Sequence, residues 1–109
     1  MITLKIKPLS ANDMYNGKKI KSNAYRKYEK TILSMLPNEY LIPKGKLKLT
    51  AKIGVSSPLA DLDNTLKPFI DCLQLKYSFN DKRIYKITIE KDDVPKGEEF
   101  IKFSIKEKL

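Results

Sequence analysis

The sequence predicts an α+β fold, in which a small mixed four-stranded sheet and two principal helices follow the order β-α-β-α-β-β. Three observations lead to this prediction. The chain has 109 residues, the size of one domain, so residues 1–109 are assigned to a single domain. Four segments alternate apolar and polar residues as half-buried strands do, and two segments repeat apolar residues at helical spacing.

The N-terminal third supplies the first strand and the first helix. Residues 2–6 alternate, and the polar segment 10–22 is expected to form a loop. Ser22 or Asn23 can cap a helix that runs to Pro37, because both side chains accept hydrogen bonds from free backbone N–H groups. Three tyrosines in and before this helix either stack on nucleic-acid bases or fill the core, and their helical spacing favours the core: Tyr15, Tyr25 and Tyr28.

The clearest strand covers residues 47–55, where every second side chain is apolar and two of the others are lysines. The next helix is expected to start after Asp63, with Asn64 or Thr65 as its cap, which places Pro68 in the first turn where a missing N–H costs little. Two later segments alternate again and are predicted to pair with each other as a hairpin: residues 84–90 and 100–105.

The charge balance favours a polyanionic partner. Lysine and arginine number 22 against 13 acids, which leaves a net charge of +9. Such a surface attracts phosphate backbones, so nucleic acid is favoured over a membrane, although a merely solubilising surface looks similar. The candidate DNA contacts lie before and on the first helix, where a solvated helix face is an equal alternative: Lys18, Lys19, Lys21, Arg26 and Lys27.

Several function classes are excluded by composition. The chain has no His, which excludes Ser/His/Asp and Cys/His nucleophilic centres and His-ligated zinc. Cys72 is the only cysteine, so it has no disulfide partner within the chain, and we expect it to fill core space. No apolar run is long enough to span a membrane, and the N-terminus lacks a signal peptide, so a cytoplasmic location is expected.

Three separated acids and one lysine suggest a metal site. Asp61 and Asp63 stand two residues apart before the second helix, Lys67 follows in its first turn, and Asp81 comes just beyond its end. Carboxylates without nearby His or Cys are ligands that Mg²⁺ or Mn²⁺ prefers. Because such an ion reverses the local charge, it would let an acidic patch on a basic protein meet a phosphodiester.

The same residues also have a plainer interpretation. Acids are favoured at a helix N-terminus, and Asp63 with Lys67 has the spacing of an ordinary i,i+4 ion pair. The chain would then be a non-enzymatic basic module that binds DNA or RNA, with acids that only cap a helix. A metal site acting on nucleotides is a weaker hypothesis, since no glycine-rich phosphate loop is present.

A longer pattern favours the catalytic interpretation. The run D-L-D-N-x-x-K-x-x-x-D-x-L, followed after a short gap by N-D and a strand, resembles the RusA family of Holliday junction resolvases. The match covers residues 61–84 closely, and the rest of the chain agrees only in the order of its elements. The resemblance implies a mixed α/β endonuclease that makes paired, magnesium-dependent nicks in four-way DNA junctions during recombination and repair.

The resemblance also implies roles for individual residues. Asp61 and Asp63 match the paired catalytic acids of the family, Asp81 matches the third acid, and Lys67 matches the essential lysine. All three of these acids would be metal ligands. Asp71 matches a further recurrent acid.

One position departs from the family pattern. Position 80 is Asn where the family often has Asp, which leaves Asp81 as the only carboxylate of that loop. A homodimer is implied as well, and it has a physical rationale, because a two-fold symmetric dimer places two active sites on opposing strands of a symmetric junction. The sequence does not identify the dimer surface.

Overall fold

All 109 residues are described by a computed structural model, whose elements follow the predicted order. The helices and strands are β1 (Ile2–Leu4), α1 (Asn23–Met35), β2 (Leu47–Val55), α2 (Leu66–Tyr77), β3 (Ile84–Asp93) and β4 (Phe100–Glu107). Single 3-10 turns precede α1, α2 and β3, at Ala11–Asp13, Asp63–Thr65 and Asp81–Arg83. The predicted α+β class, with a mixed four-stranded sheet and two helices, is confirmed.

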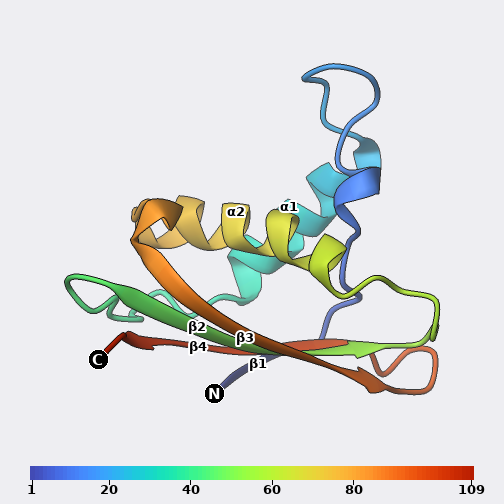
Figure 1. The fold of residues 1–109 in the computed structure, drawn as a ribbon. Coiled ribbons are helices and arrows are strands. Elements are labelled where there is room, and N and C mark those ends of the chain that lie inside the picture. Colours follow the sequence, from blue (N-terminus) through green and yellow to red (C-terminus); the bar gives the residue numbers. More distant parts are fainter.

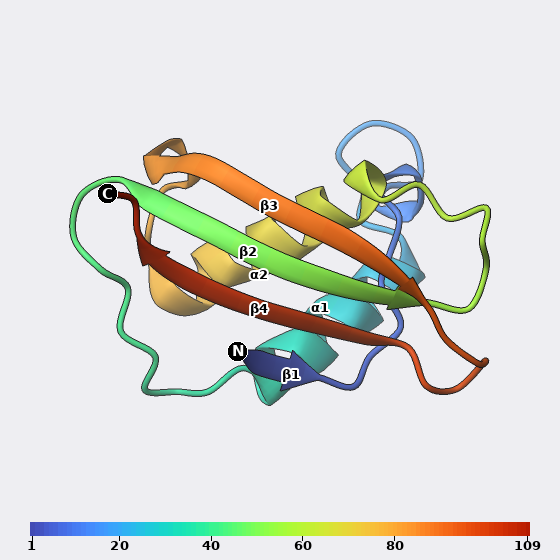
Figure 2. The same ribbon diagram turned by 60° about the horizontal axis from the view of Figure 1, so that its bottom comes forward.

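The four strands form one sheet, and both helices lie on the same face of it (Figure 1). The strand order is β1-β4-β2-β3, so the two long central strands are β4 and β2 (Figure 2). β2 pairs in parallel with β3, whereas β4 runs antiparallel to both β1 and β2. None of the helices is long and apolar enough to cross a membrane.

The predicted hairpin between the two last strands is wrong. β3 and β4 are not neighbours, because β2 lies between them and pairs with both. The reason is the crossover through α2, which returns the chain to the sheet parallel to β2. β3 thereby occupies one edge of β2, and the chain must pass to the other edge to place β4.

β2 organises the core, as its sequence pattern predicts. Its alternate side chains are buried beneath the helices, and the lysines between them lie on the open face. The buried set is Leu47, Leu49, Ala51, Ile53 and Val55. On β4, Ile101, Phe103 and Ile105 are buried in the same layer.

The two helices pack on this buried layer, and a side-chain cap fixes the start of α1. Ser22 caps α1, since its Oγ accepts from the N–H of Tyr25 at 3.0 Å. Tyr25 and Tyr28 are buried, which confirms the core interpretation for both, whereas Tyr15 is half exposed. Burial raises the pKa of each of the two buried tyrosines well above its usual value.

In α2, Phe69 and Leu73 face the sheet, and Cys72 is a buried free thiol whose pKa is raised to about 12 by burial.

Gly54 is the point of closest approach within the sheet. A Cβ built at this position would clash with ring carbons of Phe100, which lies opposite Gly54 on β4. We therefore expect Gly54→Ala to lower the free energy of unfolding by about 1–3 kcal/mol, the usual cost of overpacking. Chemical denaturation of wild type and Gly54→Ala measures this difference in the free energy of unfolding. Gly97→Ala, in the open turn before β4, would serve poorly as a control because its φ is positive, so Ser104→Ala on β4 is preferred.

Candidate functional site

The segment between β2 and α2 carries the first two acids and is fastened to the edge of the sheet. The Nζ of Lys91 on β3 donates to the carbonyls of Pro58, at 3.2 Å, and Ala60, at 3.1 Å. Asp61 follows with an exposed carboxylate, which accepts from the side-chain amide of Asn64 at 3.4 Å. The backbone of this segment is thus held while the Asp61 oxygens face solvent.

Asp63 begins the 3-10 turn that leads into α2. Its carbonyl accepts from the N–H of Leu66, and its side chain is exposed and forms no ion pair. The plainer interpretation predicted an ion pair between Asp63 and Lys67, and that prediction is therefore wrong. The Nζ of Lys67 lies 2.9 Å from Oδ1 of Asp71, one turn further along the helix. Winding the 63–65 segment as a 3-10 turn shifts Asp63 off the helical spacing that would favour Lys67.

A hydrogen-bonded chain connects Lys67 to the far end of the helix. Asp71 Oδ1 also accepts from the side-chain amide of Gln74 at 3.5 Å. The Oε1 of Gln74 in turn accepts from the backbone N–H of Asp81 at 2.8 Å. The lysine, two acids and the glutamine therefore form one network along α2, and sequence spacing alone gave no signal for the part played by Gln74.

Asp81 is positioned by the way α2 ends. Ser78 adopts a left-handed conformation, with φ of 53°, which turns the chain back toward the sheet. Asn80 then caps the turn at Asp81–Arg83, because its side chain accepts from the N–H of Lys82 at 2.8 Å. The residue that departs from the family pattern thus has a structural role, and the Asp81 carboxylate is exposed without an ion pair.

The surroundings of Lys67 raise its pKa. The main cause is the hydrogen bond to Asp71, and the charges of Asp71 and Asp81 add to it, while partial burial acts in the opposite direction. A raised lysine pKa means that the pair contributes stability at neutral pH and loses it as the pH rises through the folded-state pKa. The side chain is 60% exposed, so this contribution is small.

We expect Asp71→Asn to lower the pKa of Lys67, because it removes both the charged acceptor and the largest favourable charge. NMR titration of the Lys67 side chain measures the shift. Asp93→Asn, at the end of β3 and outside this network, should leave the titration unchanged. An unchanged pKa in Asp71→Asn would mean that the ion pair does not persist in solution.

The acids are not gathered into a closed metal site. No group of three or more Asp, Glu or Cys side chains in the structure is placed to hold an ion. Asp61 and Asp63 lie at the start of α2, whereas Asp81 is tied to its end through Gln74. The donor set nevertheless has the chemistry that Mg²⁺ prefers, since all three are exposed carboxylates that no lysine or arginine neutralises within ion-pair distance.

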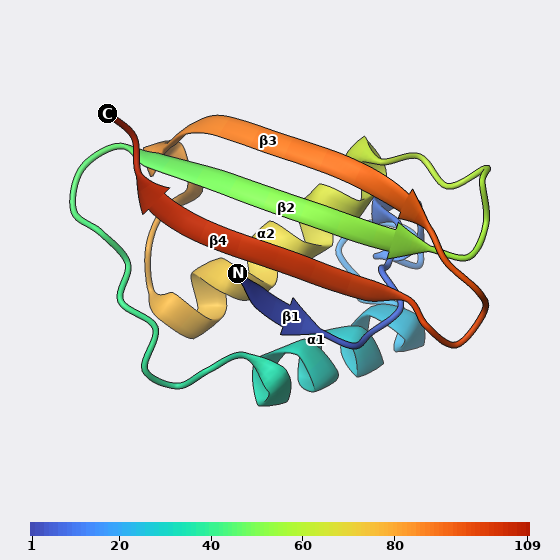
Figure 3. The same ribbon diagram turned by 90° about the horizontal axis from the view of Figure 1, so that it is seen from below.

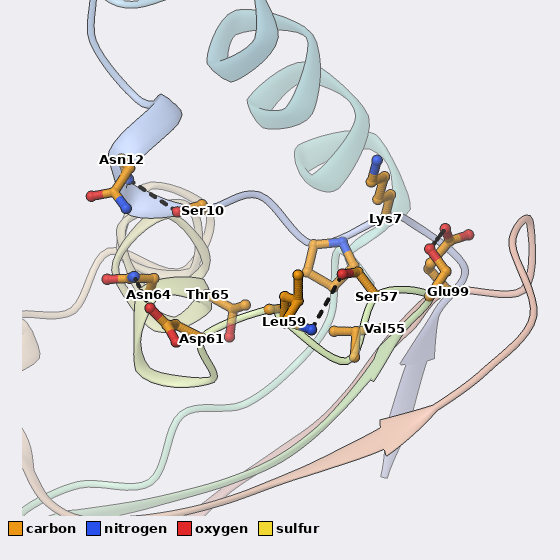
Figure 4. Close-up of a pocket in the computed structure, with 13 residues that line it drawn as sticks. Lys7, Ser10, Asn12, Val55, Ser57, Leu59, Asp61, Asn64, Thr65 and Glu99 are labelled. Atoms are coloured by element: carbon orange, nitrogen blue, oxygen red, sulfur yellow. Dashed lines mark hydrogen bonds between the residues drawn. The ribbon is translucent and has the colours of Figure 1, made fainter.

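A cavity of about 330 Å³ opens beside Asp61. Figure 4 shows Asp61 and Asn64 at one end of it and Lys7 and Glu99 at the other. Glu99 accepts from the hydroxyl of Ser56 at 2.7 Å, which lowers the pKa of Glu99. The lining comes from four separate parts of the chain, so no local sequence signal pointed to it. The cavity is large enough to accept part of a ligand next to the first acid.

The predicted basic contacts lie on the same side of the molecule as the helices. Lys18 and Lys19 are exposed in the loop that projects beyond α1 (Figure 1). Lys21 pairs with Glu29 at 3.0 Å, and the Nε of Arg26 donates to the Lys21 carbonyl. Lys27 lies on α1 and lines a second groove, of about 770 Å³, between α1 and the segment after β1. Lys21 is thus the least available of the set for binding phosphate.

Comparison with known proteins adds no assignment. The sequence matches no protein-family model, and no curated protein is similar enough to it to count as a match.

Proposed function

We propose that the chain is a magnesium-dependent endonuclease of the RusA type, which nicks branched DNA as a homodimer in the reducing setting of the cytoplasm. The observation that carries the proposal is the position of the motif residues on one helix. Asp63 begins the turn before α2, Lys67 and Asp71 pair on its exposed side, and Gln74 links that pair to Asp81. The motif is therefore an organised surface rather than a set of unrelated caps.

The roles follow from charge and exposure. Asp61, Asp63 and Asp81 would hold the ion, which would activate water and neutralise charge on the scissile phosphate. Each of these side chains is exposed and none is in an ion pair, so all three carboxylates are available to an ion. Asp71 keeps the Lys67 ammonium in place until a phosphate arrives. Lys67 would then stabilise the negative charge that develops on the phosphate oxygens.

The net positive charge of the protein supports the proposal, because it would attract the DNA substrate. A net charge of +9 attracts DNA over several ångströms, and the exposed lysines of the 10–22 loop extend the helical side of the molecule toward it. In this proposal the acids before and after α2 would be the place where a DNA phosphate meets the metal ion.

A junction assay with two controls tests the proposal. Wild-type protein with Mg²⁺ is expected to nick a labelled four-way junction and to leave a linear duplex with the same arm sequences uncut. Removal of Mg²⁺ by a chelator should stop nicking while the protein still binds the junction, because binding depends mainly on phosphate contacts. Absence of nicks with Mg²⁺ or Mn²⁺, in protein that binds the junction, would contradict the proposal.

The second candidate is a non-enzymatic module that binds DNA or RNA. The Lys67–Asp71 pair favours it, since an i,i+4 pair on an exposed helix side needs no catalytic explanation. This candidate predicts salt-sensitive binding with no metal requirement and no cleavage. The same assay therefore separates the two functions.

A further inference from the structure

The face of the sheet turned away from the helices is open. Figure 3 shows the four strands in front of both helices, and no other segment of the chain crosses over them. Because side chains alternate along a strand, the residues between the buried ones of β2 and β4 lie on this face. The β2–β3 register adds the even-numbered residues of β3. The polar and charged residues of this open face are Thr3, Lys48, Thr50, Lys52, Lys86, Thr88, Glu90, Asp92, Lys102, Ser104 and Lys106.

Positive charge is concentrated at one end of the open face. Lys48 lies directly opposite Lys86 on one neighbouring strand and Lys106 on the other. These three residues, called the lysine row below, rise from backbones about 5 Å apart. None of them is in an ion pair, whereas both acids of the face pair with Lys52, at 3.8 Å and 3.6 Å. The lysine row is therefore the part of this face without a neutralising acid.

The core does not require lysine at these positions. The three side chains lie on the face opposite the buried layer, and like charges placed directly opposite each other destabilise a sheet. A surface that serves only solubility intersperses both signs of charge, as the Lys52 end of this face does. An anion bound across the lysine row would offset the repulsion, so the row is suited to a negatively charged partner.

The groups around the lysine row indicate an extended anion rather than a small one. Thr50 lies opposite Thr88 and Ser104 in the adjoining row, and hydroxyl groups are common donors to backbone phosphates. Beside the row, the Nζ of Lys46 lies 4.8 Å from the centre of the exposed Tyr85 ring. None of these residues lines either of the two cavities described above, so they offer a surface rather than an enclosed pocket. A run of phosphates matches ammonium and hydroxyl groups spread over three strands.

We propose that the open face binds the backbone of a second DNA duplex, with the lysine row at the centre of the contact. The proposed function uses the opposite side of the sheet, where the helices and the 10–22 loop lie (Figure 1). The sheet separates the two surfaces, so each chain can hold DNA on both sides at once. Contacts from lysine and hydroxyl groups to phosphates make this binding independent of base sequence and sensitive to salt. It needs neither a metal ion nor the acids beside α2, so it does not rest on the proposed function.

Binding stoichiometry without metal tests the second surface. Wild type is titrated at low salt with a short duplex of about ten base pairs, one helical turn, and is expected to bind more than one duplex per chain. The open-face variant should bind at most one, and it carries three changes: Lys48→Gln, Lys86→Gln and Lys106→Gln. Because these changes remove like-charge repulsion, the midpoint of its thermal unfolding should equal or exceed that of wild type.

A helical-side variant provides the matched control. It makes the same charge change in the projecting loop and on α1, with Lys18→Gln, Lys19→Gln and Lys27→Gln. In wild type, addition of the duplex should shift the backbone amide NMR signals of the lysine row. The same shifts should remain in the helical-side variant, because its open face is unchanged.

Three results would overturn the proposal. The first is an open-face variant that binds as many duplexes per chain as wild type, and the second is lysine-row signals that do not move in wild type. The third is an open-face variant that no longer binds phosphatidylserine vesicles but binds DNA as wild type does, since the partner would then be a membrane. A membrane is the poorer fit, because interfacial segments bury apolar side chains and the lysine row is flanked by hydroxyl groups. Nicking is measured separately with Mg²⁺, so a chain without nuclease activity can still show the second DNA surface.

Discussion

An Asp63→Asn variant is expected to nick four-way junctions at least about 100-fold more slowly than wild type at saturating Mg²⁺. The change removes the charge of a proposed metal ligand and keeps the shape of the side chain. Asp63 is exposed and in no ion pair, and its structural bond to Leu66 uses the backbone carbonyl. Folding should therefore be unaffected, and single-turnover cleavage measures the loss directly.

The matched control is Asp93→Asn. Asp93 is also an exposed acid without an ion pair, at the end of β3, so its loss changes the net charge by the same amount. Both variants should bind DNA slightly more tightly than wild type, because each removes a negative charge from a basic protein. Equal cleavage rates for the two variants would show that Asp63 has no special role.

A Lys67→Ala variant is expected to lower the rate of nicking by about 100-fold while junction affinity falls much less. The ammonium would act on charge that develops only during the reaction, so the loss should appear in the rate and not in binding. Stability should hardly change, because exposed i,i+4 pairs such as Lys67–Asp71 contribute about 0.3–0.5 kcal/mol.

Lys96→Ala provides the comparison for this variant. Lys96 is exposed in the turn between β3 and β4 and has no ion pair, so it reports the effect of losing one positive charge from the surface. If Lys67→Ala weakened binding and cleavage in proportion, as Lys96→Ala should, Lys67 would be an ordinary phosphate contact.

The sequence was sufficient for the elements but not for all of their pairings. Alternation over residues 47–55 gives the limits of β2 and its buried face, since period-2 patterning depends on which side of the sheet is covered. The same pattern in β3 and β4 does not say which strand lies beside which. Their separation by β2 follows from the parallel return through α2, which is a property of the whole chain.

For the candidate site as well, one part could be predicted from the sequence and another part could not. Local spacing was enough to predict Asp61, Asp63, Lys67 and Asp81 as candidate site residues, because they lie within one helix and its ends. It could not decide which acid Lys67 pairs with, since Asp63 and Asp71 are both four positions away. The cavity that joins Asp61 to Glu99 was beyond prediction, because its walls come from distant parts of the chain.

The most direct test of the account is to map an ion on the protein. Titration of isotopically labelled protein with Mn²⁺ should broaden the NMR signals of residues near its binding site, and Mg²⁺ should compete with it. We expect saturable broadening centred on Asp61, Asp63 and Asp81, lost in Asp63→Asn and kept in Asp93→Asn. Broadening that spreads over all exposed acids without saturating, or that is the same in both variants, would contradict it.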